Sequence, residues 1–152
     1  MNRCIAAILL MLASSAFAGQ ASMDVTSNIV GKCTIDQVSP IDFGDLTQGT
    51  TAPDRTAAGS VSYWCSKGLR YLVTVGYGAN SQFPTRRMKG QDATNSTEFL
   101  SYDLTPRLPQ LGTGLGPAAP QRVDMEASIK GRDYNTLSVG GLLDTVVVTI
   151  IP

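Results

Sequence analysis

The residue types that perform acid–base and nucleophilic chemistry are scarce in this chain. Its 152 residues include no histidine and only three cysteines. Without histidine, the commonest general base of enzymes and any Ser-His or Cys-His nucleophile are missing. We therefore expect a protein that is not an enzyme and that needs no cofactor.

The cysteines instead indicate a structural disulfide. Residues 1–18 have the pattern of an export signal: a basic residue, Arg3, then an apolar run and the small-residue cleavage site Ala16-Phe17-Ala18. Cys4 would leave with this signal, and Cys33 and Cys65 would remain in a compartment where disulfides persist. We expect these two to be bonded. The apolar run is too short for a membrane-spanning helix, so no transmembrane anchor is expected.

Two further patterns suggest binding chemistry but have simpler explanations. Asp36, Asp42 and Asp45 could form an acid pair or a Ca²⁺ site, although carboxylates at turns and strand ends are far commoner, so we expect no metal. The glycine-rich stretch 112–116 resembles a phosphate loop but lacks the following Lys-Ser/Thr and opens no helix. We interpret its glycines as a flexible loop.

Three places on the surface could take part in recognition. Arg86, Arg87 and Lys89 could bind an anionic glycan or be solvated charges at a sheet edge. Trp64 could stack on a sugar or pack near the disulfide. The triplet 95–97 fits a glycosylation acceptor. The chain has 12 basic and 12 acidic residues, so nothing in its charge favours binding to nucleic acid.

Short strands separated by turns must position these residues. Several alternate apolar and polar residues, and none shows a sustained helical period. Hairpins are expected between 59–65 and 69–77 and between 86–90 and 99–104, with loops at 45–58 and 106–120. The other expected strands are 34–44, interrupted by a bend, 123–129 and 144–151. The pattern predicts one domain built as a sandwich of antiparallel sheets.

The two ends of the exported chain are complementary. Residues 144–151 form an apolar, β-branched strand that needs a partner on both edges, or else leaves bare backbone groups that invite another chain. Residues 23–29 alternate, with Met23, Val25 and Ile29 on one face and polar residues between them. This segment could supply a missing strand.

Seven motifs, taken in order, resemble the spore coat protein U domain family, which includes subunits of archaic chaperone–usher pili. The resemblance spans roughly residues 23–151. It is carried by Cys33-Thr34-Ile35, Ile41-Asp42-Phe43-Gly44, residues 59–65, Tyr71-Leu72-Val73-Thr74-Val75, Arg86-Arg87-Met88, Leu100-Ser101-Tyr102-Asp103-Leu104 and residues 144–150.

The resemblance implies an all-β, incomplete immunoglobulin-like antiparallel sandwich that lacks its last strand and is completed by donor-strand complementation. In those terms residues 1–18 are a signal peptide, 19–32 the donor segment and 33–152 the pilin-like sandwich. The donor residues are Met23, Val25 and Ile29. The acceptor edge carries Val146, Val148 and Ile150.

The resemblance also implies a function and partners. The chain would be a structural subunit of a surface pilus or a spore-coat-like layer, exported through the periplasm to the cell surface. A periplasmic chaperone would fill the groove until, at an outer-membrane usher, a neighbouring subunit replaces it. The alternative is a monomeric secreted carbohydrate-binding or adhesive module whose own N-terminal strand closes its sheet. The short joint Gly31-Lys32 argues against such a return.

Overall fold

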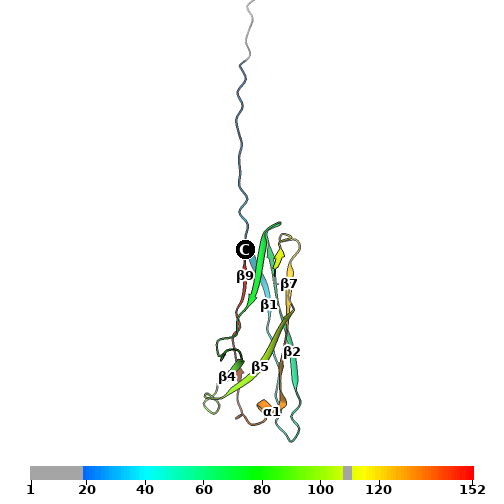
Figure 1. The fold of residues 1–152 in the computed structure, drawn as a ribbon, viewed down its shortest axis with the longest axis vertical. Coiled ribbons are helices and arrows are strands. Elements are labelled where there is room, and N and C mark those ends of the chain that lie inside the picture. Colours follow the sequence, from blue (N-terminus) through cyan, green and yellow to red (C-terminus); the bar gives the residue numbers. More distant parts are fainter. Residues whose placement is uncertain (1–18, 108–110) are drawn as a thin grey trace, which may run out of the picture.

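The fold is an elongated stack of β-strands from which one extended segment projects (Figure 1). The computed structural model describes residues 19–107 and 111–152, so the expected export signal lies outside the described part. Residues 19–32 run along the long axis, away from the body. The short helix α1 (Gly131–Tyr134) lies at the opposite end of the body.

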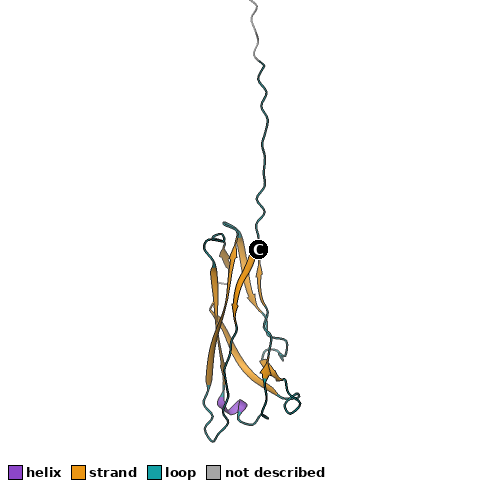
Figure 2. Ribbon diagram, turned by 180° about the vertical axis from the view of Figure 1, so that it is seen from behind, coloured by secondary structure: helices purple, strands orange, loops and turns teal. Residues whose placement is uncertain are grey.

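The strands form two antiparallel sheets. One sheet has six strands in the order β1-β2-β7-β5-β4-β8, and the other has three in the order β6-β3-β9. Figure 2 shows the strands from behind. The prediction of an all-β antiparallel architecture is confirmed. The bounds are β1 Cys33–Ser39, β2 Arg55–Cys65, β3 Arg70–Val75, β4 Arg86–Gly90, β5 Phe99–Arg107, β6 Leu111–Thr113, β7 Gln121–Ile129, β8 Leu142–Leu143 and β9 Val148–Ile151.

The core forms where apolar residues alternate along the strands. In β7, Val123, Met125, Ala127 and Ile129 are buried, whereas the residues between them are not. A period of two places these four side chains on one face of the sheet. They pack with inward-facing residues of the other strands, among them Val61, Tyr63, Tyr71, Val73, Leu100 and Leu104.

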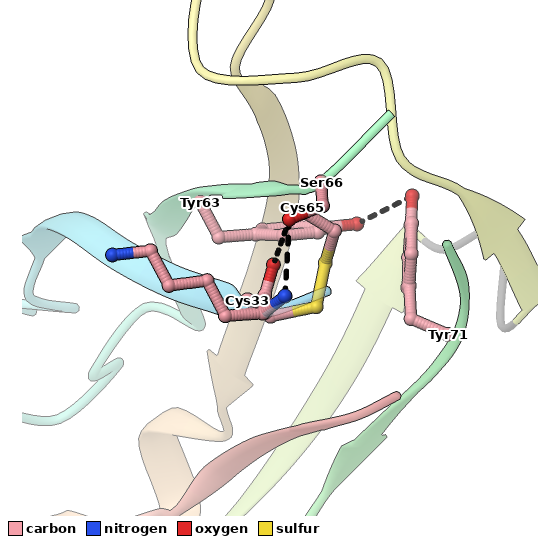
Figure 3. The surroundings of a disulfide bond; sticks show 6 residues. Cys33, Tyr63, Cys65, Ser66 and Tyr71 are labelled. Carbon is pink, nitrogen blue, oxygen red and sulfur yellow. Dashed lines mark hydrogen bonds between the residues drawn. A yellow bond between two sulfur atoms is a disulfide. The ribbon is translucent and has the colours of Figure 1, made fainter. Parts of the chain in front are cut away.

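The Cys33–Cys65 disulfide is present, as predicted. It joins the first residue of β1 to the last residue of β2, with the Cα atoms 4.0 Å apart. Figure 3 shows the bond beside Tyr63, whose hydroxyl lies 3.2 Å from that of Tyr71. Burial, followed by this hydrogen bond, raises the pKa of Tyr63 above its ordinary value. The disulfide therefore fastens β1 to the core at one end of the molecule.

The first predicted hairpin is wrong and the second is confirmed. β2 pairs with β1 and β7, whereas β3 pairs with β6 and β9. The chain thus crosses from one sheet to the other at residues 66–69, because Tyr63 and Tyr71 both face the core from opposite sheets. β4 and β5 form the expected hairpin.

Other boundaries differ from the sequence expectation. Residues 55–58, expected in a loop, belong to β2 and pair with residues 126–129 of β7. The long loop expected at 106–120 contains β6, which pairs with β3. β1 ends at Ser39, because Pro40 has no N–H to continue the ladder. In each case a partner distant in sequence, or a proline, decided the outcome.

Candidate functional site

Two strand edges face an open groove. β1 is an outer strand of the six-stranded sheet, and β9 is an outer strand of the three-stranded sheet. In residues 19–107 and 111–152, no strand pairs with the second edge of either one. A bare strand edge is a template for another strand.

A cavity of about 340 Å³ lies between these edges. One wall carries Val38, Ile41 and Phe43, and the opposite wall carries Val146 and Val148. The base consists of core side chains, including Val61, Leu104, Met125 and Ala127. The groove therefore opens directly onto the hydrophobic core.

A second cavity of about 710 Å³ extends the groove toward α1. The two cavities share Ile41, Phe43, Met88 and Leu142, so they adjoin. Leu46, Tyr134 and Leu137 complete the apolar lining at this end. Together the cavities form one elongated site, called here the groove.

Two of the predicted acceptor residues, Val146 and Val148, line the C-terminal wall of the groove, and Ile150 continues the same face beyond the cavity. Val146, Val148 and Ile150 are half-buried and pack on the core, whereas Val147 and Ile151 are 62% and 47% exposed. The side chains thus alternate, although residues 144–147, expected within the strand, precede β9 rather than belong to it.

The backbone of this wall is free on the groove side. The carbonyls of Thr145 and Val147 accept hydrogen bonds from Ala79 and Gly76 at 3.0 and 2.9 Å. Because successive backbone groups of an extended chain point to opposite edges, those of Val146, Val148 and Ile150 point toward the groove. These are the groups that an added strand would bind.

The β1 wall was not predicted as part of the site. Ile35 lies opposite Tyr63 and Val38 opposite Val61, both of which are buried. Opposite residues share a face, so Ile35 and Val38 face the interior, yet they are 47% and 62% exposed. A bulge between Ile35 and Gln37 keeps both on this face. Two inward-facing apolar side chains therefore lack cover.

A hydrogen-bonded carboxylate, Asp144, lies on the C-terminal wall of the groove. The Tyr102 hydroxyl donates to Asp144 Oδ2 at 2.6 Å, and the backbone and side-chain amides of Asn80 donate to Asp144 Oδ1 at 3.0 and 3.2 Å. Burial, and then the bond to Asp144, raises the pKa of Tyr102. Asp144 thus ties the C-terminal wall to β5 and to the residues that follow β3.

The predicted donor residues lie outside the groove. Met23, Val25 and Ile29 are 86%, 90% and 92% exposed on the extended segment. The segment is fixed at its base, where Lys32 N–H donates to Ser66 Oγ at 3.0 Å and Ser66 N–H donates to the Lys32 carbonyl at 2.9 Å. The structure therefore does not bring donor and acceptor residues together within one chain.

The other sequence candidates have structural roles. Asp42 Oδ1 accepts the Gly44 N–H at 2.8 Å in a turn where Gly44 has φ of 65°. The described residues contain no group of three His, Cys, Asp or Glu side chains placed to hold a metal. Gly112 lies against Tyr71, and Gly114 exchanges backbone hydrogen bonds with Gly68 and Leu69. Close packing, rather than flexibility, thus accounts for these two glycines.

The arginines, Trp64 and Asn95 are likewise engaged. Arg86 donates to the Gly76 carbonyl, and Arg87 donates to the Asn80 carbonyl and to Gln82. Trp64 is half-buried, with Lys32 Nζ 5.2 Å from its ring centroid. Asn95 is 1% exposed and bonds Asp92 and Gly141, so its side chain is not accessible for glycosylation.

Of two solved structures that resemble this chain, one reaches a TM-score that supports a shared fold. The structure of the CsuC-CsuE chaperone-tip adhesion subunit pre-assembly complex from archaic chaperone-usher Csu pili of Acinetobacter baumannii matches with a TM-score of 0.50 and 22% identity. The match covers 81% of this chain and 40% of that one. A chaperone-tip adhesin complex of CFA/I fimbriae biogenesis matches at a TM-score of 0.42 and 16% identity, over 78% of this chain and 41% of that one. No curated protein sequence matches.

The fold and groove define a two-sheet β-sandwich with a groove between the edges of β1 and β9 that are unpaired in the described residues. The Spore Coat Protein U domain model matches residues 20–106, more than half of the chain. The chain belongs to this family. It spans about two fifths of the length of the chain that it matches in the Csu complex. No helix in the described ranges is long and apolar enough to cross a membrane.

Proposed function

We propose that this chain is a structural subunit of a surface pilus or coat layer that polymerises by donor-strand exchange. In this proposal residues 19–32 of one copy fill the groove of the next. The observation that carries it is that one chain holds both an uncovered apolar groove and an uncovered apolar segment. The donor side chains are Met23, Val25 and Ile29, and the receiving edge carries Val146, Val148 and Ile150.

The energies support such an exchange. Burying three apolar side chains at about 1.5–3 kcal/mol each contributes roughly 5–9 kcal/mol, from which the cost of ordering the segment is subtracted. Main-chain hydrogen bonds to the two open edges add affinity, and the pockets for alternate side chains add specificity. The isolated body leaves Ile35 and Val38 without cover, which an inserted strand would supply.

The base of the segment favours donation to a second copy. Lys32 is held by Ser66, and Gly31 packs against Leu69, where an added Cβ would lie 3.0 Å from Leu69 Cδ1. The segment projects along the long axis, away from the body (Figure 1), whereas the groove is lined by residues of the body itself. To fill that groove it would have to reverse direction within the joint at Gly31.

The export route and partners follow from the same proposal. A solved structure that resembles this fold is a chaperone-subunit pre-assembly complex of a chaperone-usher system. We extend that route to this chain. Residues 1–18 direct export, a periplasmic chaperone covers the groove, and at an outer-membrane usher the donor of a neighbouring subunit replaces it. The product is a polymer at the cell surface.

Two variants mixed together test the proposal. Val25→Asp disables the donor, and Val38→Arg blocks the groove; both side chains are exposed in the free chain, at 90% and 62%, so the body should still fold. Each variant alone should remain a monomer on an unboiled gel, and the mixture should give a dimer of one copy of each. Wild-type protein that remains a monomer would instead support a self-completed secreted module.

A further inference from the structure

The inner face of the C-terminal wall is apolar at every position except one. Alternate residues from 142 to 150 are half-buried, and the residues between them are exposed. Asp144 lines the same cavity as Val146 and Val148. From residue 142 onward, the inner face therefore runs apolar, acidic, apolar, apolar, apolar. The members are Leu142, Asp144, Val146, Val148 and Ile150.

The donor segment has the same interruption in reverse order. The residues that share the face of Met23 are odd-numbered, and one of them, Ser27, is polar between Val25 and Ile29. Read from residue 29 backward, this face runs apolar, polar, apolar, apolar. When the two strands run in opposite directions, the second position of each pattern is polar: Asp144 in the wall and Ser27 in the donor.

The geometry of the chain favours that opposite direction. The base of the segment, at the start of β1, and the end of β9, beside the C-terminus, lie at the same end of the body (Figure 1). In a filament of copies stacked in one orientation, the segment enters the next groove at the far end, near α1, with its N-terminal end foremost. It then runs antiparallel to the wall formed by residues 142–151.

We propose that Ser27 of one copy lies opposite Asp144 of the next and sets the register of the inserted strand. The inference rests on the proposed function and specifies its partner as a second copy of this chain. Ile29 then faces Leu142, Val25 faces Val146 and Met23 faces Val148. A slip of one residue turns the polar face of the donor into the groove. A slip of two places Val25 or Ile29 against Asp144.

The hydrogen bonds of Asp144 leave room for one more donor. A carboxylate offers about four acceptor sites, and the Tyr102 hydroxyl and the two Asn80 amides use three of them. The Ser27 hydroxyl supplies the fourth bond as the inserted strand excludes water. An apolar residue at position 27 would cover the Asp144 carboxylate but could not donate the hydrogen bond that water supplies in the free chain, so the inserted strand would be less stable.

Cysteine pairs on the outer face can measure the register directly. In the proposed register Thr26 lies opposite Thr145, whose carbonyl bonds Ala79 rather than the groove edge. The two therefore form a non-hydrogen-bonded pair, in which side chains are closest. The test variant is Thr26→Cys with Thr145→Cys. The matched controls combine Thr26→Cys with Leu143→Cys or with Val147→Cys, each shifted by two residues; diagonal neighbours are too far apart for a good disulfide.

For the Thr26–Thr145 pair we expect a covalent ladder on a boiled, non-reducing gel. The amount of cross-linked protein should be at least about tenfold greater than for either shifted pair. A stronger ladder from a shifted pair would overturn the register while leaving donor-strand exchange intact. If neither the wild type nor any of the three variants forms polymers on an unboiled gel, both the register and the proposed function are wrong.

A second measurement tests the role of Ser27 itself. Polymers of Ser27→Val should dissociate about tenfold faster than wild type, because a bond to a charged group is lost. Thr26→Val, its outward-facing neighbour, should dissociate at the wild-type rate. Equal dissociation rates for the two variants would overturn the assignment of Ser27.

Discussion

Replacing Val25 by Asp separates assembly from folding. Val25 is 90% exposed in the free chain, so the change should leave the free energy of unfolding of the body unaltered. In the proposed polymer the same position would enter the groove between Val38 and Val146, both of which line its smaller cavity. The substitution forfeits about 1.5–3 kcal/mol of valine burial and places a carboxylate in an apolar site, which costs further free energy.

A combined loss above about 4 kcal/mol corresponds to roughly a thousandfold weaker association. The assay is an unboiled gel of the exported protein, scored for ladder against monomer, with circular dichroism melting to confirm folding. Thr26→Asp is the matched control, since it adds the same charge one residue away on the outward face. The reasoning is refuted if Val25→Asp polymerises like wild type, or if Thr26→Asp loses polymers to the same extent.

The remaining predictions concern the body. Removing both Cys33 and Cys65 by serine substitution should lower the free energy of unfolding by about 3–4 kcal/mol in the loop-entropy model, measured by urea denaturation; an unchanged midpoint would argue against this stabilising role. Tyr102→Phe removes the bond to Asp144 and should cost about 1–2 kcal/mol in the same measurement. Because the pKa of Tyr102 is raised above its ordinary value of 10.0, its contribution is complete below pH 10 and declines as the pH rises further. The stability of Tyr102→Phe should therefore fall less steeply in alkali than that of wild type.

Local sequence patterns were sufficient to predict much of this fold. Strands such as β7 show a clear period of two, and the pair Cys33 and Cys65 was the obvious disulfide once Cys4 was assigned to the signal. Local patterns did not show which strands belong to the same sheet. The turn at residues 66–68 looks like a hairpin, but the two buried tyrosines that flank it face each other from different sheets.

The β1 wall of the groove could not be predicted from the sequence pattern. Val146, Val148 and Ile150 alternate plainly, so their shared face was predictable. Ile35 and Val38 are three residues apart, and in a regular strand they would face opposite sides. The bulge between Ile35 and Gln37 restores their common face, and nothing in the local sequence specifies it.

Amide hydrogen exchange of the C-terminal wall tests the central claim most directly. The backbone N–H groups of Val146, Val148 and Ile150 point to the open edge, whereas the residues between them bond toward β3 and the residues that follow it. In the monomeric Val25→Asp variant, we predict fast exchange at these three amides. In wild-type polymers, we predict strong protection at the same amides. Slow exchange in the monomer, or equally fast exchange in the polymer, would contradict the account of an open edge completed by a second chain.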